Sequence, residues 1–418
     1  MQTGLILAIF TVGYLAIIFE SFIKLNKAAI AIFMAVSCWS VFFLTDHTSL
    51  QNDTNLLMVD TASVAQIVFY LIGAMAIVEV IDSHRGFKII TDVIQTKSKR
   101  KMLWLISFVS FFLSALLDNL TTTILMVSLL RKIIPSAKDR LLFCCIVVVA
   151  SNAGGAWTPI GDVTTTMLWI SGQLSTWPVM SALFLPSVVS VVVPLIYFTF
   201  RLKGNISSEK NLPVDVAEPG AKLVFWLGMA GLIFVPVFKA WTGLPPFMGV
   251  LISLAFLWLV TDGLHVPHEK RKHLQMPHIL TKIDISGVLF FLGILLSVGA
   301  LDAAHLLSAL AEKLGEVFTS LPVLAMIIGG ISAIIDNVPL VAATMGMYPL
   351  DQFPTDHTLW MMIAYAAGTG GSLLIIGSSA GVALMGMEKI DFLTYMKKVT
   401  IPVLAGYIAG MVVYVSFI

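Results

Sequence analysis

Leu-Ser-Ala-Leu-Leu-Asp-Asn at 113–119 and Ile-Ser-Ala-Ile-Ile-Asp-Asn at 331–337 are two versions of one sequence. Each lies in the middle of a long apolar run, and each places an aspartate at its centre. An ionisable side chain inside a membrane costs at least about 2.5 kcal/mol, so it is usually retained for a function. These two segments therefore mark both the architecture and the candidate site.

Two further elements recur at nearly the same separation along the chain. They are the glycine pairs 154–155 and 370–371, each followed by Ile-Gly, and the Gly/Asp pairs Gly73 with Asp82 and Gly293 with Asp302. Three elements with one separation indicate an internal repeat. We expect a first repeat at 1–203, a polar linker at 204–220 and a second repeat at 221–418.

The composition is that of a membrane protein. The chain has 418 residues, of which 58% are hydrophobic and 12% charged, whereas soluble domains carry about 25% charged residues. The apolar runs are continuous over about twenty residues, enough for a helix to span a bilayer. A net charge of +1 suggests no nucleic-acid partner. The cysteines Cys38, Cys144 and Cys145 lie in apolar runs without metal-ligand spacing and are interpreted as core residues.

The apolar runs predict an all-α membrane protein with about ten transmembrane helices. Two runs, 102–133 and 322–349, hold the Asp-Asn pairs and are interpreted as re-entrant hairpins. Two others, 140–171 and 358–387, contain Gly-rich polar patches and are interpreted as broken helices. Each half then crosses the membrane an odd number of times, which would invert the second repeat, as in many secondary transporters.

The basic residues predict the orientation. With hairpins at both Asp-Asn runs, all but Lys239 and Lys313 of the 25 Lys and Arg residues fall on one side, which is expected to be cytoplasmic. Both termini would then be external. Asp53 and Asp60 would lie in an outer loop, and the amphipathic stretches 84–101 and 303–320 would lie as helices in the interface.

The hairpin tips carry candidate ion ligands. Asp118 is followed by Asn119 and by threonines, and Asp336 is followed by Asn337 and then by Val-Pro. Pro339 suits the first turn of a helix but removes the hydroxyls present in the first half, so the two sites should differ. The alternative is that each aspartate only caps the helix that follows it.

The broken helices carry further candidates. Ser-Asn-Ala-Gly-Gly-Ala-Trp-Thr-Pro-Ile-Gly-Asp-Val-Thr-Thr-Thr at 151–166 frees backbone carbonyls and supplies Asn152, Asp162, Thr164 and Thr165 as oxygen ligands for a hard cation. A structural cap is the alternative for Asp162. The copy in the second half lacks the aspartate and offers the hydroxyls of Thr369, Ser378 and Ser379. Packing by small residues is the alternative there.

Asp118, Asp162 and Asp336 have no Lys or Arg partner within these runs. A buried, unpaired carboxyl tends to hold a proton, whereas a bound cation favours its ionised form. Proton and cation would then compete for one site. We expect the cation at Asp118, Asn119, Asn152 and Asp162, with Asp336 and Asn337 contributing from the second hairpin.

Titratable residues near the cytoplasmic ends are less specific. Glu79 is either a proton relay or a side chain that extends to water beside Arg85. His84, His265, His268 and His273 could sense pH, but their positions in inner loops favour solvent-exposed surface residues.

The Asp-Asn hairpin tips and the Ser-Asn-Ala-Gly-Gly…Thr-Pro-Ile-Gly-Asp-Val-Thr-Thr motif resemble those of the NhaD-type sodium/proton antiporters of the ion transporter superfamily. The resemblance covers nearly the whole chain. It implies export of Na⁺ or Li⁺ driven by inward protons, without a cofactor. It further implies a bacterial inner membrane, a homodimer, and a transport domain of hairpins and broken helices that moves against a scaffold.

Other functions fit less well. Dicarboxylate carriers of the same superfamily typically have Ser-Asn-Thr at the hairpin tips, where this chain has Asp-Asn, so a carrier of dicarboxylate, citrate or arsenite is the nearest alternative. An intramembrane aspartyl protease usually has Gly-x-Gly-Asp, where this chain has Pro-Ile-Gly-Asp ending at Asp162, and proteolysis leaves the repeat unexplained. We therefore expect a transporter and not an enzyme.

Overall fold

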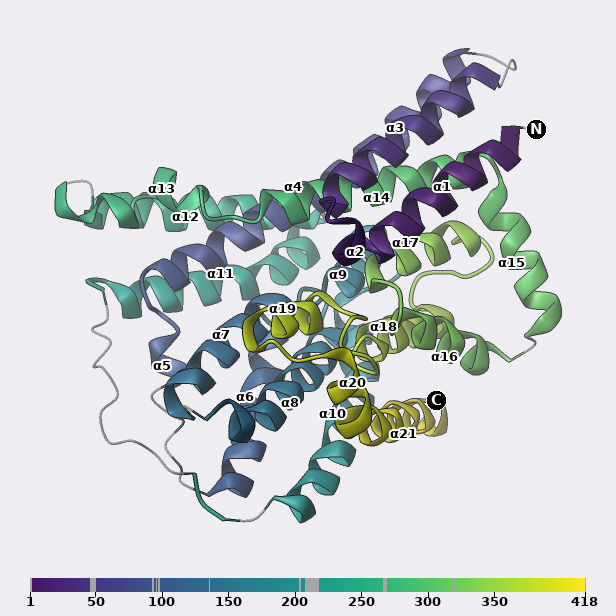
Figure 1. The fold of residues 1–418 in the computed structure, drawn as a ribbon. Coiled ribbons are helices and arrows are strands. Elements are labelled where there is room, and N and C mark those ends of the chain that lie inside the picture. Colours follow the sequence, from purple (N-terminus) through teal and green to yellow (C-terminus); the bar gives the residue numbers. More distant parts are fainter. Residues whose placement is uncertain are drawn as a thin grey trace.

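The computed structural model is built of helices (Figure 1). It describes residues 2–45, 50–91, 94, 96, 98–134, 136–202, 204–206, 218–265, 269–318 and 320–417. Within these ranges every regular element is a helix, apart from one isolated β-bridge between Ser98 and Asn205. Residues 207–217 of the expected linker, and His268, lie outside the described residues.

The helices of the first half follow the order expected from the sequence. They are α1 (Gln2–Ile18), α2 (Glu20–Ile23), α3 (Lys27–Thr45), α4 (Leu50–Ser83), α5 (Lys88–Thr91), α6 (Lys99–Ser114), α7 (Asn119–Ile133), α8 (Ala137–Ala156), α9 (Val163–Ile170) and α10 (Thr176–Arg201).

The helices of the second half repeat that order of long, paired and interrupted elements. They are α11 (Ala221–Thr242), α12 (Pro246–His265), η1 (Glu269–Leu274), α13 (Met276–Leu280), α14 (Ile285–Ala303), α15 (Leu306–Val317), α16 (Leu321–Ser332), α17 (Asn337–Met347), α18 (Thr358–Gly370), α19 (Ser379–Glu388), α20 (Phe392–Tyr395), η2 (Met396–Thr400) and α21 (Ile401–Phe417). The exact division at 203 and 221 and the inversion of the second repeat stay predictions.

Both expected hairpins are pairs of short helices. The helices of the first pair, α6 and α7, have 16 and 15 residues, and those of the second, α16 and α17, have 12 and 11. At 1.5 Å per residue they are about 24, 23, 18 and 17 Å long. A bilayer core is about 30 Å thick, so none of the four crosses it alone if it runs along the normal.

The all-α membrane fold is confirmed. Eight helices in the described ranges are long and apolar enough to cross a membrane. The shorter α1 and the interrupted pair α18–α19 account for the remaining two of the ten expected crossings. Both broken helices are present, since α8 stops before α9 and α18 stops before α19.

Two expectations for the regions between spans are wrong. Residues 50–63, predicted as an acidic outer loop, form the first part of α4, whose 34 residues extend about 51 Å and exceed the bilayer core. The stretch 84–101 is not one interfacial helix, since its described residues hold only the four-residue α5 before α6 begins at Lys99. Its counterpart at 303–320 does contain a helix, α15, with one apolar face.

The helices form two packed groups (Figure 1). The panel group comprises α1, α3, α4, α11, α12 and α14, with α3 against α14 and α4 against α12. The hairpin group comprises α6–α10 and α16–α21, with α10 against α21. In Figure 1 most of the panel group lies above most of the hairpin group.

The same packing recurs in both halves. Helix α6 packs on α8 as α16 packs on α18, and α7 packs on α19 as α17 packs on α9. One hydrogen bond is also repeated: the Ser114 hydroxyl donates to the carbonyl of Ser151, and the Ser332 hydroxyl donates to the carbonyl of Ala367. Each hairpin is therefore fixed to the broken helix of its own half and contacts that of the other.

Two of the four histidines differ from the surface interpretation. His84 follows α4 and His265 ends α12; both side chains are fully buried, and their Nε2 atoms lie 2.9 Å apart. His84 Nδ1 lies 2.7 Å from the carbonyl of Val80. Because a carbonyl only accepts, His84 donates through Nδ1–H and accepts at Nε2 from His265. His273, by contrast, is half exposed near Glu218.

This pair should make stability depend on pH. Burial lowers the pKa of His84, whereas a histidine in the unfolded chain has a pKa of about 6.5. The unfolded state therefore binds the proton more readily, and stability should fall by up to about 1.4 kcal/mol per pH unit below that value. Thermal unfolding in detergent should show this fall, and His265→Gln should flatten it, while the surface variant His273→Gln keeps it. The prediction would be contradicted if the unfolding temperature depended on pH in the same way in all three proteins.

Candidate cation site

The first hairpin tip holds a capped aspartate. Asp118 precedes α7, and its two carboxylate oxygens accept from the backbone N–H of Thr121 at 2.8 Å and from the Thr121 hydroxyl at 2.7 Å. These bonds satisfy N–H groups that have no partner inside the helix. The capping alternative is thus realised at Asp118, and the carboxylate also lines a cavity.

The second hairpin tip holds an uncapped aspartate. Asp336 precedes α17, but its side chain makes no bond to that helix, and its Oδ1 is buried without a hydrogen-bond partner in the described part of the chain. Oδ2 lies 3.9 Å from the ammonium of Lys27 at the start of α3. The sequence predicts no Lys or Arg partner for the three aspartates within their apolar runs, and Lys27 lies outside them. The basic group near Asp336 therefore comes from the start of another helix.

The first broken helix is shaped by glycine. At Gly154 a Cβ atom would collide with the carbonyl oxygen of Phe111 in α6, and at Gly155 with the carbonyl oxygen of Gly161. The chain therefore folds back on itself between α8 and α9 and lies directly against the hairpin. Thr158 in the break donates to the carbonyl of Ala115 at 2.7 Å, which satisfies an acceptor at the hairpin tip. Asp162 then caps the start of α9 and is 2% exposed.

Three segments, contributed by both halves, meet at Asp162. Its Oδ2 lies 3.3 Å from Nδ2 of Asn119 in the first hairpin and 3.4 Å from Nδ2 of Asn337 in the second. Its Oδ1 accepts from the backbone N–H of Thr164. All these residues are buried. Two hairpin tips and one broken helix therefore converge on a single carboxylate.

Asn152 extends this network to the second broken helix. Its Oδ1 accepts from Asn119 at 3.0 Å, and its Nδ2 lies 2.9 Å from the hydroxyls of both Ser372 and Ser378. Ser378 also caps α19. Ser372 is a site residue that the sequence analysis did not select, although a hydroxyl directly after the Gly-Gly break was a signal for it.

The remaining predicted residues lie at different distances from this network. The hydroxyl of Thr165 is buried in α9 without a hydrogen-bond partner among the described residues. Thr369 donates instead to the carbonyl of Tyr365 within α18, and Ser379 lines the cavity. Glu79 is not among the residues that line it: its carboxylate accepts from Ser83 and lies 3.8 Å from the ammonium of Lys282.

A cavity of about 210 Å³ lies between the panel and hairpin groups. Asp118, Asn119 and Asp336 line it from the hairpin tips. The other side of the cavity is lined by apolar residues of α4 and by residues at or next to the ends of α2, α3 and α14, namely Glu20, Asn26, Lys27, Asp284 and Ser286. The hairpin tips are therefore reached from the side of the molecule on which these helix ends lie.

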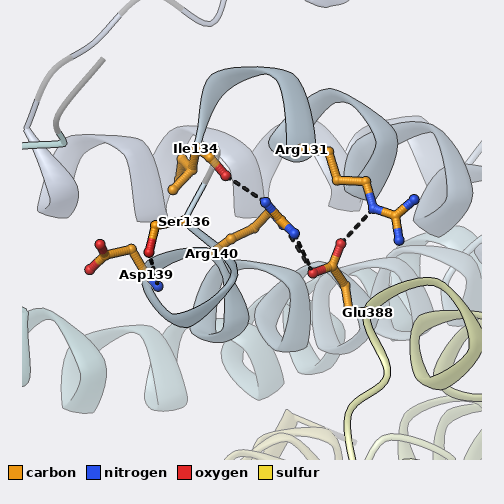
Figure 2. Close-up of polar contacts among 6 residues, drawn as sticks. All are labelled: Arg131, Ile134, Ser136, Asp139, Arg140 and Glu388. Carbon is orange, nitrogen blue, oxygen red and sulfur yellow. Dashed lines mark hydrogen bonds and ion pairs between the residues drawn. The ribbon is translucent and has the colours of Figure 1, made fainter. Parts of the chain in front are cut away.

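A buried ion pair joins the two halves of the hairpin group (Figure 2). Glu388, the last residue of α19, is 2% exposed at its side chain; its two oxygens each lie 2.7 Å from a nitrogen, Nε of Arg131 in α7 and Nη2 of Arg140 in α8. Arg140 also donates to the carbonyl of Ile134. The carboxylate thus connects the second broken helix to the first hairpin and the first broken helix.

The sequence matches a family model and proteins that are named as transporters. The family model described as "Citrate transporter" (CitMHS) matches residues 5–362. "Sodium/proton antiporter 1" of Arabidopsis thaliana is 52% identical over 417 residues, which cover 98% of this chain and 71% of that protein. "Na(+)/H(+) antiporter NhaD" of Alkalimonas amylolytica is 29% identical over 444 residues, which cover 98% and 89%. The chain belongs to the citrate transporter family and, within it, to the NhaD-type sodium/proton antiporters.

A solved structure supports the fold. The crystal structure of the YdaH transporter of Alcanivorax borkumensis superimposes with a TM-score of 0.58 at 13% identity, covering 90% of each chain. This likeness concerns the fold alone.

The expected resemblance to NhaD-type antiporters is confirmed. The chain is a transporter and not an enzyme, so the aspartyl protease is not favoured. The family description names citrate, whereas both relatives above are named for sodium/proton exchange. A carrier of dicarboxylate, citrate or arsenite is accordingly not favoured either.

Proposed function

We propose that this NhaD-type protein exchanges cytoplasmic Na⁺ or Li⁺ for external protons by alternating access. The observation that carries the proposal is the convergence of Asn119 and Asn337, one from each half, on the buried Asp162, with Asn152 accepting from Asn119. The names of the antiporter relatives support the choice of ions.

The network can change from a proton site to a cation site. Asn119 and Asn337 direct their N–H groups at Asp162. A half-turn of each amide exchanges its nitrogen for its oxygen. The same three residues would then present amide and carboxylate oxygens, the ligands that hard cations prefer. The hydroxyl of Thr165 is a further buried oxygen in α9.

Coupling follows from competition for Asp162. A carboxyl buried without a counter-ion favours its protonated form. A cation bound among the oxygens favours the ionised form, so binding of one releases the other. A carboxyl that carries either a proton or a cation, and never both, gives exchange and not co-transport.

Orientation and movement complete the proposal. The basic loops indicate that the helix ends around Lys27 and Asp284 face the cytoplasm, so the cavity is open inward and both termini are external. The hairpin group would move against the panel group to open the other side. We propose that the protein lies in a bacterial inner membrane and forms a homodimer, as the resemblance implies. Mass photometry in nanodiscs would measure the dimer.

The experiment is proton flux in proteoliposomes that carry a pH gradient. NaCl or LiCl should dissipate the gradient, KCl is the comparison cation, and Asp118→Ala should remove the response. No response of the folded wild type to any cation would refute the proposal. Uptake assays with citrate, succinate and arsenite would then follow.

A further inference from the structure

The two hairpin aspartates are not equivalent, and a single substitution in the repeat explains why. Asp118 is satisfied by the N–H and the hydroxyl of Thr121. The residue at the corresponding place after Asp336 is Pro339. Proline has neither an N–H nor a hydroxyl, so the helix offers Asp336 no cap at that position. The carboxylate is left available for a partner from outside its hairpin.

Lys27 is that partner. Its ammonium lies 3.9 Å from Asp336 Oδ2 and 4.5 Å from the centre of the Phe290 ring in α14. The ring helps to hold the charge in place. Lys27 and Phe290 belong to the panel group and Asp336 to the hairpin group, so the contact bridges the two groups. The 3.9 Å distance is too long for a direct hydrogen bond, so the contact is electrostatic and a small cation can compete with it.

The cavity places this ammonium where a cation would arrive. Among the described residues that line the cavity, Lys27 is the one Lys or Arg, and the acidic residues are Glu20, Asp118, Asp284 and Asp336. One-third of the Lys27 side chain and one-fifth of the Asp336 side chain are exposed. The ion pair is therefore accessible from the cavity, and Na⁺ can reach it without unfolding of the hairpin.

We propose that Lys27 is a built-in competitor of the transported cation: its ammonium neutralises Asp336 when no Na⁺ is bound, and Na⁺ must displace it. The inference rests on the proposed function. Displacement also breaks a contact between the panel and hairpin groups. Cation binding thereby frees the hairpin group to move. In the empty, deprotonated protein the contact between Lys27 and Asp336 holds the hairpin group against the panel group.

The test compares Lys27→Met with Lys27→Arg, which keeps the charge, and with Lys24→Met. Lys24 is a matched control because it lies in the same connection, is exposed and does not line the cavity. The readout is the apparent KM for Na⁺ in the proteoliposome assay at alkaline pH, where carboxylates are ionised. Lys27→Met should lower the KM about tenfold. Lys27→Arg and Lys24→Met should stay near the wild-type value.

An unchanged or raised KM in Lys27→Met would overturn the inference and leave Lys27 as a structural contact. If Lys27→Met does not fold, Asp336→Asn removes the same ion pair from the other side. In the Asp336→Asn background, Lys27→Gln should leave the KM unaltered, and a further tenfold decrease would also overturn the inference. Failure of the proposed function is recognised separately, since wild type and Lys24→Met would then show no Na⁺-dependent flux.

Discussion

Asp162→Asn is expected to abolish Na⁺-dependent proton flux, with a loss of at least about 100-fold. The amide keeps the size of the side chain and can still cap α9, as the carboxylate does through the N–H of Thr164. It can neither bind a proton reversibly nor offer a negative charge to a cation. The measurement is dissipation of a proton gradient by NaCl in proteoliposomes with equal amounts of folded protein.

Asp391→Asn provides the matched control. Asp391 is also the residue before a helix, and it accepts from the backbone N–H of Thr394, but its side chain is exposed on α20. The same chemical change should leave flux within about twofold of wild type, because surface substitutions rarely have large effects. Flux retained in Asp162→Asn would show that the convergent carboxylate is not the exchange site.

Gly154→Ala is expected to destabilise the protein severely. The added methyl group would collide with the backbone oxygen of Phe111, which cannot move aside as a flexible side chain could. Overpacking of this kind costs about 1–3 kcal/mol or more. The repeat provides a second case, because Gly370 lies in the same way against the backbone oxygen of Gly329. Both variants should unfold at clearly lower temperature and lose flux, since the hairpins can no longer lie against the broken helices.

Gly263→Ala is the control for these variants. Gly263 lies in α12, and a Cβ atom there would meet no atom within 4 Å. Alanine is favoured over glycine in a helix by about 1 kcal/mol, so this variant should be as stable as wild type or slightly more stable. Equal unfolding temperatures for Gly154→Ala and Gly263→Ala would mean that the close contact of α6 with α8 is not needed.

Much of this architecture could be predicted because membrane residence constrains the sequence strongly. Apolar runs, the Asp-Asn tips and the Gly-Gly breaks defined the spans, hairpins and broken helices. The repeat placed equivalent residues in equivalent positions. The convergence of Asn119, Asn152 and Asp162 was expected as one cation site, and the structure brings the three together.

The parts that could not be predicted depend on packing between distant segments. Ser372 joins the network through a contact with Asn152 across the two halves. Lys27 reaches Asp336 because α3 packs near the second hairpin, and no local pattern reports that. His84 and His265 appeared to be loop residues, yet α4 and α12 pack together and bury both.

The most direct test of the central claim is proton release by purified protein in weakly buffered detergent solution when Na⁺ is added. NaCl should release protons from the wild type, choline chloride should release none, and NaCl should release none from Asp162→Asn. Proton release from Asp162→Asn equal to that of the wild type, or none from the folded wild type, would contradict exchange at Asp162.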